Sequence, residues 1–427
     1  MSTGTMRNSG IEWIGDVPAH WEFKRLKYTS TLAGRIGWQG LTSEEYLTEG
    51  VHLVTGTDFK EGRIDWDSCV RVSEARWAEA TQVQLREGDL LITKDGTVGK
   101  VAICRNMPNK ASLNSGVMVI RQKVPMSTRF LYWVLQSPVF TGWFNDVNAG
   151  ASTISHLYQA DFYNFGFYVP PTVREQELVA SLLDAETAKI DQAMSLLRRE
   201  LETMEQLKKS LIYEAVTKGL DPTVPLRPSG VDWIGDIPEH WLSKRLKYVL
   251  NNFDHLREPV EASLRTSDSD ILYPYFGASG IIDEIDAFNV DFDSILIGED
   301  GANLVNRTLP ISYLANGEYW VNNHAHILLP KNGSRLYYYY ALEAADYSKL
   351  ITGSAQPKLS QKNLENQWLP VPPENEQRRI AKNLERHLAE ISAVIDRKAS
   401  QRVLLRKQRQ SLIFEYVTGK RRVNEVA

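Results

Sequence analysis

The chain has 427 residues, which is more than one ordinary domain needs and enough for two hydrophobic cores. Hydrophobic residues make up 43% and charged residues 24%, a composition typical of soluble globular proteins. No apolar run approaches the roughly 18 to 20 residues that span a bilayer, and the N-terminus lacks the pattern of a signal peptide. We therefore expect a cytoplasmic protein with no membrane contact.

The net charge of −4 is distributed unevenly. Basic and acidic residues number 17 and 17 in residues 1–168, 7 and 10 in 169–222, 12 and 19 in 223–368, and 13 and 7 in 369–427. Attraction to phosphates supplies most non-specific affinity for nucleic acid. A chain with this balance is expected to bind nucleic acid weakly unless partners add basic surface.

The first feature along the chain is a phrase that occurs twice, which we call the tryptophan phrase. SGIEWIGDVPAHWEFKRLKY spans 9–28 and SGVDWIGDIPEHWLSKRLKY spans 229–248, with 14 identities in 20 positions at a constant offset of 220. Such agreement indicates an internal duplication. The tryptophans are expected to pack each phrase onto a core, while KRLKY suits either phosphate contact or docking to a helix.

Short apolar runs separated by turn residues follow each phrase. VHLVTG, DLLITK, KVAIC and GVMVI lie within 29–168, and ILYPYFGASGII, SILIG and YWVNNHAHILL lie within 249–368, where residues 335–347 read as a helix. These runs predict two mixed α/β domains with irregular sheets. We place the first domain at 1–168 and the second at 223–370.

A long helix is predicted after each of these domains, over 169–222 and 371–427. Each begins near a VPP and a Glu-Gln pair and closes on SLIYEAVT or SLIFEYVT, with 34 residues from the glutamine to the serine in both copies. Apolar residues at heptad spacing predict that the helices form a coiled coil with each other, about 65 Å long. The seam residues are Leu183, Ile190, Leu197, Met204, Leu211, Leu384, Ile391, Leu405 and Leu412, and Lys398 interrupts the second series.

Little in the sequence points to catalysis or to metal binding. KDGTVGK at 94–100 lacks the first glycine and the Ser/Thr of a phosphate-binding P-loop. Cys69 and Cys104 form no ligand motif, and for the H-x-H pair of His324 and His326 packing is favoured over metal binding. We therefore expect no catalytic residue, metal or cofactor in this chain.

Three polar islands recur in both halves and suit contact with DNA grooves. They are KDGTVGK against GEDGANLVNR, Leu-Asn-Ser against Val-Asn-Asn, and GASTISHL against GSAQPKLS. Their amide, hydroxyl and charged side chains can contact base edges or phosphates, although Asx turns and caps explain a single residue equally well. The candidates are Lys94, Asp95, Thr97, Lys100, Asn114, Ser152, Thr153 and His156 in the first half, and Glu299, Asn303, Arg307, Asn323, Gln356 and Lys358 in the second.

Taken together, these motifs resemble the specificity subunits of type I DNA restriction-modification systems. The resemblance covers nearly the whole chain and rests on W-I-G-D-x-P-x-H-W, LLITKDGTVGKV, ILIGEDGAN, YPYFGASGII, WVNNHAHIL and the helix motifs. It implies an α/β (α+β) fold with two target-recognition domains joined by an antiparallel coiled coil in a pseudo-twofold duplication. Each domain would read one half of a bipartite, asymmetric site in double-stranded DNA, and the coiled coil would set the spacer.

The same resemblance implies the partners. Two methyltransferase subunits would modify adenine N6, and restriction/translocase subunits would complete the enzyme. S-adenosylmethionine, ATP and Mg are expected in those subunits. A different reading of the duplicated layout is a scaffold that binds two copies of a protein without reading DNA, and a weaker one is an enzyme with its active site in the divergent domains.

Overall fold

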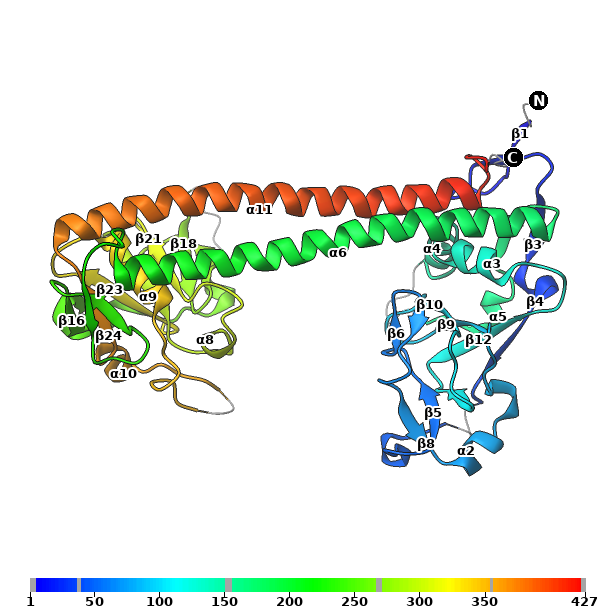
Figure 1. The fold of residues 1–427 in the computed structure, drawn as a ribbon, viewed down its shortest axis with the longest axis horizontal. Helices are drawn as coiled ribbons and strands as arrows, with labels where there is room; N and C mark the ends of the chain where they lie inside the picture. The colour runs from blue at the N-terminus through cyan, green and yellow to red at the C-terminus, as the bar shows by residue number, and fades with distance from the viewer. Residues whose placement is uncertain (1–4, 37–39, 150–155, 266–270, 354–355, 424–427) are drawn as a thin grey trace. The chain divides into compact units, whose positions relative to one another are not determined.

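The structure, a computed structural model, describes residues 5–36, 40–149, 156–265, 271–353 and 356–423. It divides into two compact units (Figure 1): unit 1 contains 1–197 and 400–427, and unit 2 contains 198–399. Each unit combines one globular lobe with one end of each long helix. In the described ranges, no helix is both long and apolar enough to cross a membrane.

Two sheets form the centre of unit 1. The larger has the order β10-β9-β12-β4 and is antiparallel, and the smaller has the order β11-β5-β8, with β11 and β5 parallel. The strands are β4 (Ser30–Gly34), β5 (Val51–Val54), β8 (Val70–Val72), β9 (Leu90–Thr93), β10 (Val101–Ile103), β11 (Ala111–Leu113) and β12 (Val117–Gln122). Additional strands are β1 (Met6–Asn8), β2 (Asp16–Pro18), β3 (Glu22–Arg25), β6 (Phe59–Lys60), β7 (Arg63–Ile64) and β13 (Gly166–Val169). The helices of the lobe are α1 (Leu26–Thr29), α2 (Glu74–Ala78), α3 (Thr128–Leu135), α4 (Pro138–Val147) and α5 (Gln159–Phe162).

Unit 2 repeats this topology. Its larger sheet has the order β17-β23-β20-β21, and its smaller sheet has the order β19-β18-β22, with β18 and β22 parallel. The strands are β17 (Leu250–Asn252), β18 (Tyr273–Gly277), β19 (Gly280–Ile285), β20 (Ser294–Gly298), β21 (Ser312–Ala315), β22 (Trp320–Val321) and β23 (Ala325–Pro330). Additional strands are β14 (Leu226–Pro228), β15 (Asp236–Pro238), β16 (Leu242–Arg245) and β24 (Trp368–Val371), and the helices are α7 (Leu246–Val249), α8 (Asn303–Asn306), α9 (Arg335–Ala344) and α10 (Gln361–Glu365).

The central strands are apolar without alternation because both of their faces are covered. Leu90 and Ile92 of β9 lie in the core beneath α3 and α4, whereas Leu91 lies in the core shared with the smaller sheet. In β20, Ile295 and Leu296 divide between two cores in the same way. The prediction of two mixed α/β lobes related by duplication is confirmed.

The long helices are α6 (Val173–Lys218) and α11 (Glu374–Val417). Each begins just after a Pro-Pro and ends before a glycine with positive φ, Gly219 at 79° and Gly419 at 70°. In each unit the two helices lie side by side (Figure 1) and are joined by an ion pair. In unit 1, Arg409 Nε is 2.9 Å from Asp191 Oδ1. Lys398 Nζ is 2.8 Å from Glu200 Oε2 in unit 2.

These two ion pairs fix the direction of the helix pair. From one pair to the other, α6 advances nine residues while α11 goes back eleven, so the helices are antiparallel. Lys398, which interrupts the heptad series, thus has an acidic partner. None of the nine predicted seam residues is exposed, and four of them are buried: Leu183, Ile190, Leu197 and Leu384.

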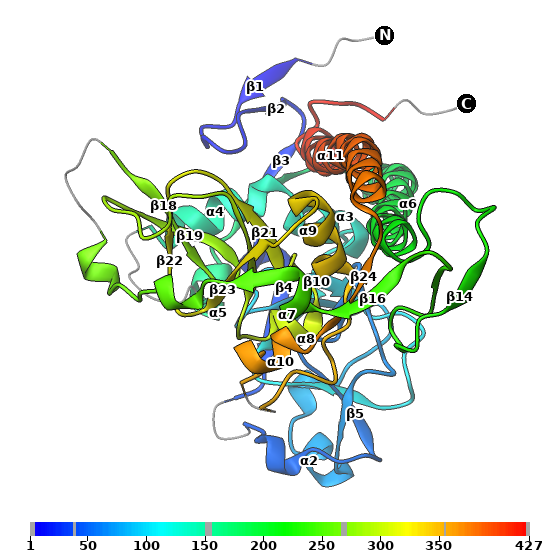
Figure 2. The same cartoon turned by 90° about the vertical axis from the view of Figure 1, so that its left-hand side faces the viewer.

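The Glu-Gln pair in the first turn of each long helix fastens the lobe to that helix. Gln176 Oε1 accepts from Ser127 N, the N-cap of α3, at 2.8 Å, and its Nε2 donates to Pro170 O at 2.9 Å. In unit 2, Gln377 binds Ser334 N and Pro372 O, at 2.9 Å each. Helix α9 therefore lies beside the long helices (Figure 2), and Tyr337 Oη donates to Val216 O at 3.2 Å.

The glutamate of each pair holds the tryptophan phrase. Trp21 Nε1 donates to Glu175 at 3.2 Å, and Trp241 Nε1 donates to Glu376 at 2.9 Å. The two indoles are 3% and 0% exposed, so the expectation that the phrase packs onto a core is met for these two tryptophans.

Replacing Gln377 tests this fastening. In Gln377→Ala, the Ser334 N–H and the Pro372 carbonyl lose their partner at a site where the glutamine is 2% exposed. Each unsatisfied buried group costs about 1–3 kcal/mol, so the free energy of unfolding in urea should fall by about 2–4 kcal/mol. The control is Gln361→Ala, because the Gln361 amide is exposed and donates to Glu365 at the surface. Equal losses in both variants would contradict the role of Gln377.

Candidate nucleic-acid interface

The three islands meet at the end of the larger sheet in each unit. In unit 1, Lys94 N donates to Gly116 O at 2.9 Å and Lys94 O accepts from Leu157 N at 3.0 Å. In unit 2, Glu299 N donates to His324 O at 2.8 Å and Glu299 O accepts from Leu359 N at 2.7 Å. The same backbone frame thus joins segments that are far apart in the sequence. We call each such cluster of loops a tip site.

A fourth loop, absent from the sequence-based candidates, completes each tip site. It comprises residues 55–58 in unit 1 and 278–279 in unit 2, each following a strand of the smaller sheet. Asn114 N donates to Val54 O at 2.9 Å, and Asn322 N donates to Phe276 O at 3.1 Å. The signal in the sequence was a glycine with small hydroxyl residues after an apolar run, TGTD and GASG.

The tip site of unit 1 displays polar side chains of mixed character. Asp95 pairs with Nδ1 of His156, which comes from a different loop. Asn114 Nδ2 donates to Tyr46 Oη at 3.0 Å. Within the described part of the chain, the Lys94 ammonium has no hydrogen-bond or ion-pair partner.

The remaining candidates of unit 1 divide into described and undescribed residues. Lys100 Nζ is 3.4 Å from Gly56 O of the fourth loop, and Thr97 is exposed. Ser152 and Thr153 lie outside the described residues.

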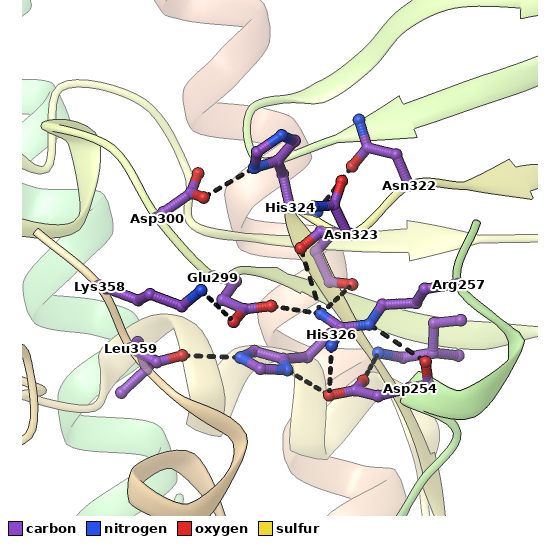
Figure 3. A network of polar contacts seen from close by, with 12 residues as sticks. Asp254, Arg257, Glu299, Asp300, Asn322, Asn323, His324, His326, Lys358 and Leu359 are labelled. Atoms are coloured by element: carbon purple, nitrogen blue, oxygen red, sulfur yellow. Dashed lines mark hydrogen bonds and ion pairs between the residues drawn. The ribbon is translucent and has the colours of Figure 1, made fainter. Parts of the chain in front are cut away.

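A buried polar network underlies the tip site of unit 2 (Figure 3). Arg257 lies between the carboxylates of Asp254 and Glu299, and Lys358 Nζ is 3.1 Å from Glu299. His326 is fully buried, and its ring nitrogens face Asp254 Oδ2 at 2.6 Å and the carbonyl of Leu359 at 2.8 Å. Both ring nitrogens therefore have an oxygen within hydrogen-bond distance, which fixes the orientation of the ring.

The two carboxylates of this network are held in their charged form. Burial raises the pKa of Asp254, but the hydrogen bond and positive charge of His326 outweigh it and place the pKa below the ordinary value of 3.8. Burial also raises the pKa of Glu299, and the hydrogen bond from Arg257 then lowers it below the ordinary 4.5. Glu299 is thus a charged structural carboxylate held by ion pairs with Arg257 and Lys358, not a free reading group.

Two other candidates of unit 2 also have structural partners. Asn303 Oδ1 accepts from Leu309 N at 2.9 Å, and its amide donates to the Leu309 carbonyl at 3.1 Å, so it closes the loop after α8. Arg307 donates to the backbone carbonyls of Glu343 and Ala345. Asn323, Gln356 and Lys358 are exposed.

An Asp-His pair occurs at the equivalent place in both tip sites. Asp300 Oδ2 lies 2.7 Å from His324 Nδ1 (Figure 3), and Asp95 pairs with His156. The two histidines come from non-equivalent loops, so different segments supply the histidine in the two units. Among the described residues neither Nε2 has a hydrogen-bond partner, which leaves that atom available to a ligand.

The histidines give no support for a metal site. His324 is exposed at the tip whereas His326 is buried in the network, so the H-x-H pair does not converge on one point. Across the described ranges, no group of three or more His, Cys, Asp or Glu residues is arranged to hold a metal ion. Cys69 and Cys104 are buried, and burial raises the pKa of the Cys69 thiol to about 12.

These features define the protein as a duplicated recognition module: two lobes of one topology, each ending in polar loops and fastened to an antiparallel coiled coil. The family model described as Type I restriction modification DNA specificity domain matches residues 54–202 and 238–400. The chain belongs to this family, so it is a type I restriction enzyme specificity subunit with two DNA target-recognition domains.

Known specificity subunits match this chain over part or nearly all of its length. The chain is 21% identical to the putative type I restriction enzyme MjaX specificity subunit of Methanocaldococcus jannaschii over 96% of both chains. It is 33% identical to a putative specificity subunit of Haemophilus influenzae, in a match that covers 33% of this chain and 36% of that one. A solved structure from work on complex assembly and conformational transition of the type I R-M system matches with a TM-score of 0.71 at 17% identity, over 95% of this chain and 99% of the other.

The network of unit 2 should make stability depend on pH. Both carboxylates have a depressed pKa in the folded state, so their contribution is complete above 4.5 and decreases as the pH falls through the folded-state values. Arg257→Met should lower the free energy of unfolding by about 3 kcal/mol at pH 7. The difference from the unmodified protein should shrink between pH 5 and about pH 3 in urea titrations.

The control is Arg378→Met, which removes an exposed pair with Glu374 on α11 and should cost no more than about 1 kcal/mol. A difference for Arg257→Met that stays constant down to about pH 3 would contradict the assignment of charged carboxylates to the network.

Proposed function

We propose that each tip site reads one half of a bipartite, asymmetric DNA target and that this reading directs adenine-N6 methylation and restriction by partner subunits. The observation that supports it is the assembly of four polar loops on the same backbone frame in both units, with different side chains on each. Two identical backbone frames with different side chains suit the recognition of two different base sequences in the same kind of molecule. The chain itself performs no catalytic step in this proposal.

The chemistry of the tip sites fits base edges. Asn323 carries an exposed amide, which can form paired hydrogen bonds with adenine, and Lys94 carries an ammonium that suits guanine. The Nε2 atoms of His156 and His324 add one adjustable donor or acceptor per unit. Thr97, Lys100, Gln356 and Lys358 surround these groups and can contact phosphates or bases.

The partners in this proposal are double-stranded DNA, two methyltransferase subunits and restriction/translocase subunits, in the cytoplasm. S-adenosylmethionine, ATP and Mg would act in those subunits. The lobe of residues 223–368, with 12 basic and 19 acidic residues, supports a need for partners in stable DNA binding. A scaffold that binds two protein copies would need no polar tip sites, so the tip sites favour DNA reading.

The test maps methylated adenines in cells with and without this chain, with its partner subunits present. We expect one bipartite methylated motif that disappears without the chain. In His324→Ala, the base preference should become less strict in one half-site only. His156→Ala is its matched control and should relax bases in the other half-site only. A poorly formed base contact costs about 1–3 kcal/mol, which is enough to show partial methylation of altered sites. The absence of any fixed motif would contradict DNA reading, and a change in both halves would contradict independent reading.

We also propose that the coiled coil sets the spacer between the half-sites. The support is the antiparallel pairing of α6 and α11, which have 46 and 44 residues. At 1.5 Å per residue the helices are about 65–70 Å long. One helical turn of DNA, about 10 base pairs, is the expected distance between the centres of the half-sites.

Lengthening both helices by one heptad tests this role. Insertions after Leu197 and after Gln401 keep the antiparallel pairs on each side in register. They add about 10.5 Å, so the unread spacer should grow by up to about three base pairs at about 3.4 Å each. Replacement of a heptad without a change of length is the control. An active protein with an unchanged spacer would disprove the proposal.

A further inference from the structure

Each copy of the tryptophan phrase ends in an exposed tyrosine that neither the cores nor the tip sites use. Tyr28 is 66% exposed and Tyr248 is 63% exposed. Lys27 Nζ lies 5.1 Å from the ring centre of Tyr28, and Lys247 Nζ lies 5.3 Å from that of Tyr248. The same lysine-tyrosine arrangement therefore survives at both positions on the protein surface.

A second lysine joins each pair. Lys123 Nζ donates to Lys27 O at 3.0 Å, and Lys331 Nζ donates to Lys247 O at 2.8 Å. The second lysines are 208 positions apart, whereas the phrases are 220 apart, so the intervening chain changed by 12 residues while the lysine kept its place. We call Lys27, Tyr28 and Lys123 basic patch 1 and Lys247, Tyr248 and Lys331 basic patch 2.

A purely structural role does not account for the patches. The carbonyls that accept from the second lysines lie at exposed contacts, where water can replace the ammonium. The tyrosines are about two-thirds exposed, so they bury little surface. None of the four ammonium groups forms an ion pair with another described residue. In both units one lysine thus lies over a tyrosine ring with a second lysine next to it, and no described residue supplies a compensating negative charge.

The preserved partner must present the same chemistry to both units, because the patches agree where the tip sites differ. The lobe of residues 223–368 carries 12 basic and 19 acidic residues, yet it retains both lysines of basic patch 2. A phosphodiester backbone is the same whatever its sequence and is attracted by such unpaired cations. We propose that the two basic patches bind the DNA backbone and anchor each lobe on the duplex without reading bases. This proposal rests on the function proposed above only in taking DNA as the ligand.

The position of the patches fits this role. Strand β12 leads from the loop at Gly116 to Lys123, and β23 leads from the loop at His324 to Lys331, with six residues in each strand. At about 3.4 Å per residue the patch lies about 20 Å from its tip site. That length corresponds to about six base pairs, so a patch would meet phosphates roughly half a turn from the bases that its tip site contacts.

The experiment uses the full chain in complex with its methyltransferase subunits. The variant replaces all four lysines by glutamine (Lys27→Gln, Lys123→Gln, Lys247→Gln, Lys331→Gln). Binding is measured against salt concentration on a duplex that carries the methylated motif and on one with both half-sites scrambled. The slope of log affinity against log salt should become less negative by about 0.9 for each lost phosphate contact, about 2–4 in total. The affinity for both duplexes should fall by the same factor, and the methylated motif should stay unchanged.

Lys110→Gln is the matched control, because Lys110 lies 4.9 Å from the ring centre of Trp77 in unit 1. It should leave the slope unchanged. The double variant Tyr28→Ala with Tyr248→Ala should lower the affinity for both duplexes and leave the slope of log affinity against log salt unchanged. Variants of a single patch, Lys27→Gln with Lys123→Gln, keep the test open if the quadruple variant does not fold.

Three results would overturn the proposal. They are an unchanged slope, a changed methylation motif, and loss of methyltransferase subunits from the complex with normal DNA binding by what remains. The last result would assign the patches to a protein partner. If the unmodified complex had no fixed motif, the proposed function would fail, while the slope on the scrambled duplex would still decide the role of the patches.

Discussion

The glutamate and glutamine in the first turn of each long helix set the position of everything else in their unit. The buried glutamine binds the N-cap of α3 or α9 and the carbonyl before its own helix, and the glutamate binds the indole of the tryptophan phrase. Because the glutamines and the indoles are buried, each of them must keep its partner. The first turn of each long helix therefore holds the lobe and the tryptophan phrase to that helix.

The same contacts explain why the tryptophan phrase occurs twice. Trp241 receives the end of α6, where a Cβ on Gly219 would come within 3.1 Å of its ring, and it bonds the start of α11. Trp21 receives the end of α11 at Gly419, also at 3.1 Å, and it bonds the start of α6. Unit 1 is thus closed by the first and last parts of the chain. Each copy of the tryptophan phrase thus contacts the end of one long helix and the start of the other.

The sequence predicted the architecture better than it predicted the side chains of the site. Heptad spacing, the Pro-Pro starts and the apolar runs are local signals, and they identified the two long helices, α9 and several central strands such as β9, β12, β20 and β23. By contrast, the partners of Asn303 and Arg307 lie at backbone carbonyls that only the folded chain brings near. The fourth loop escaped notice because its membership depends on the pairing of β5 with β11 and of β18 with β22. Long-range pairing has no signature within a short window of sequence.

The equivalence of Lys94 and Glu299 shows how one frame can support two different surfaces. Both residues make the same two backbone hydrogen bonds, yet the Lys94 ammonium has no partner among the described residues, while the Glu299 carboxylate forms ion pairs with Arg257 and Lys358. The charge at this position is therefore independent of the fold. Beneath the buried Glu299 carboxylate lies a network of compensating charges. Some of the acidic residues of that lobe, Asp254 and Glu299, are therefore buried and do not add to its surface charge. The surface offered to a ligand is set by the exposed loops, so an acidic composition does not by itself exclude contact with DNA.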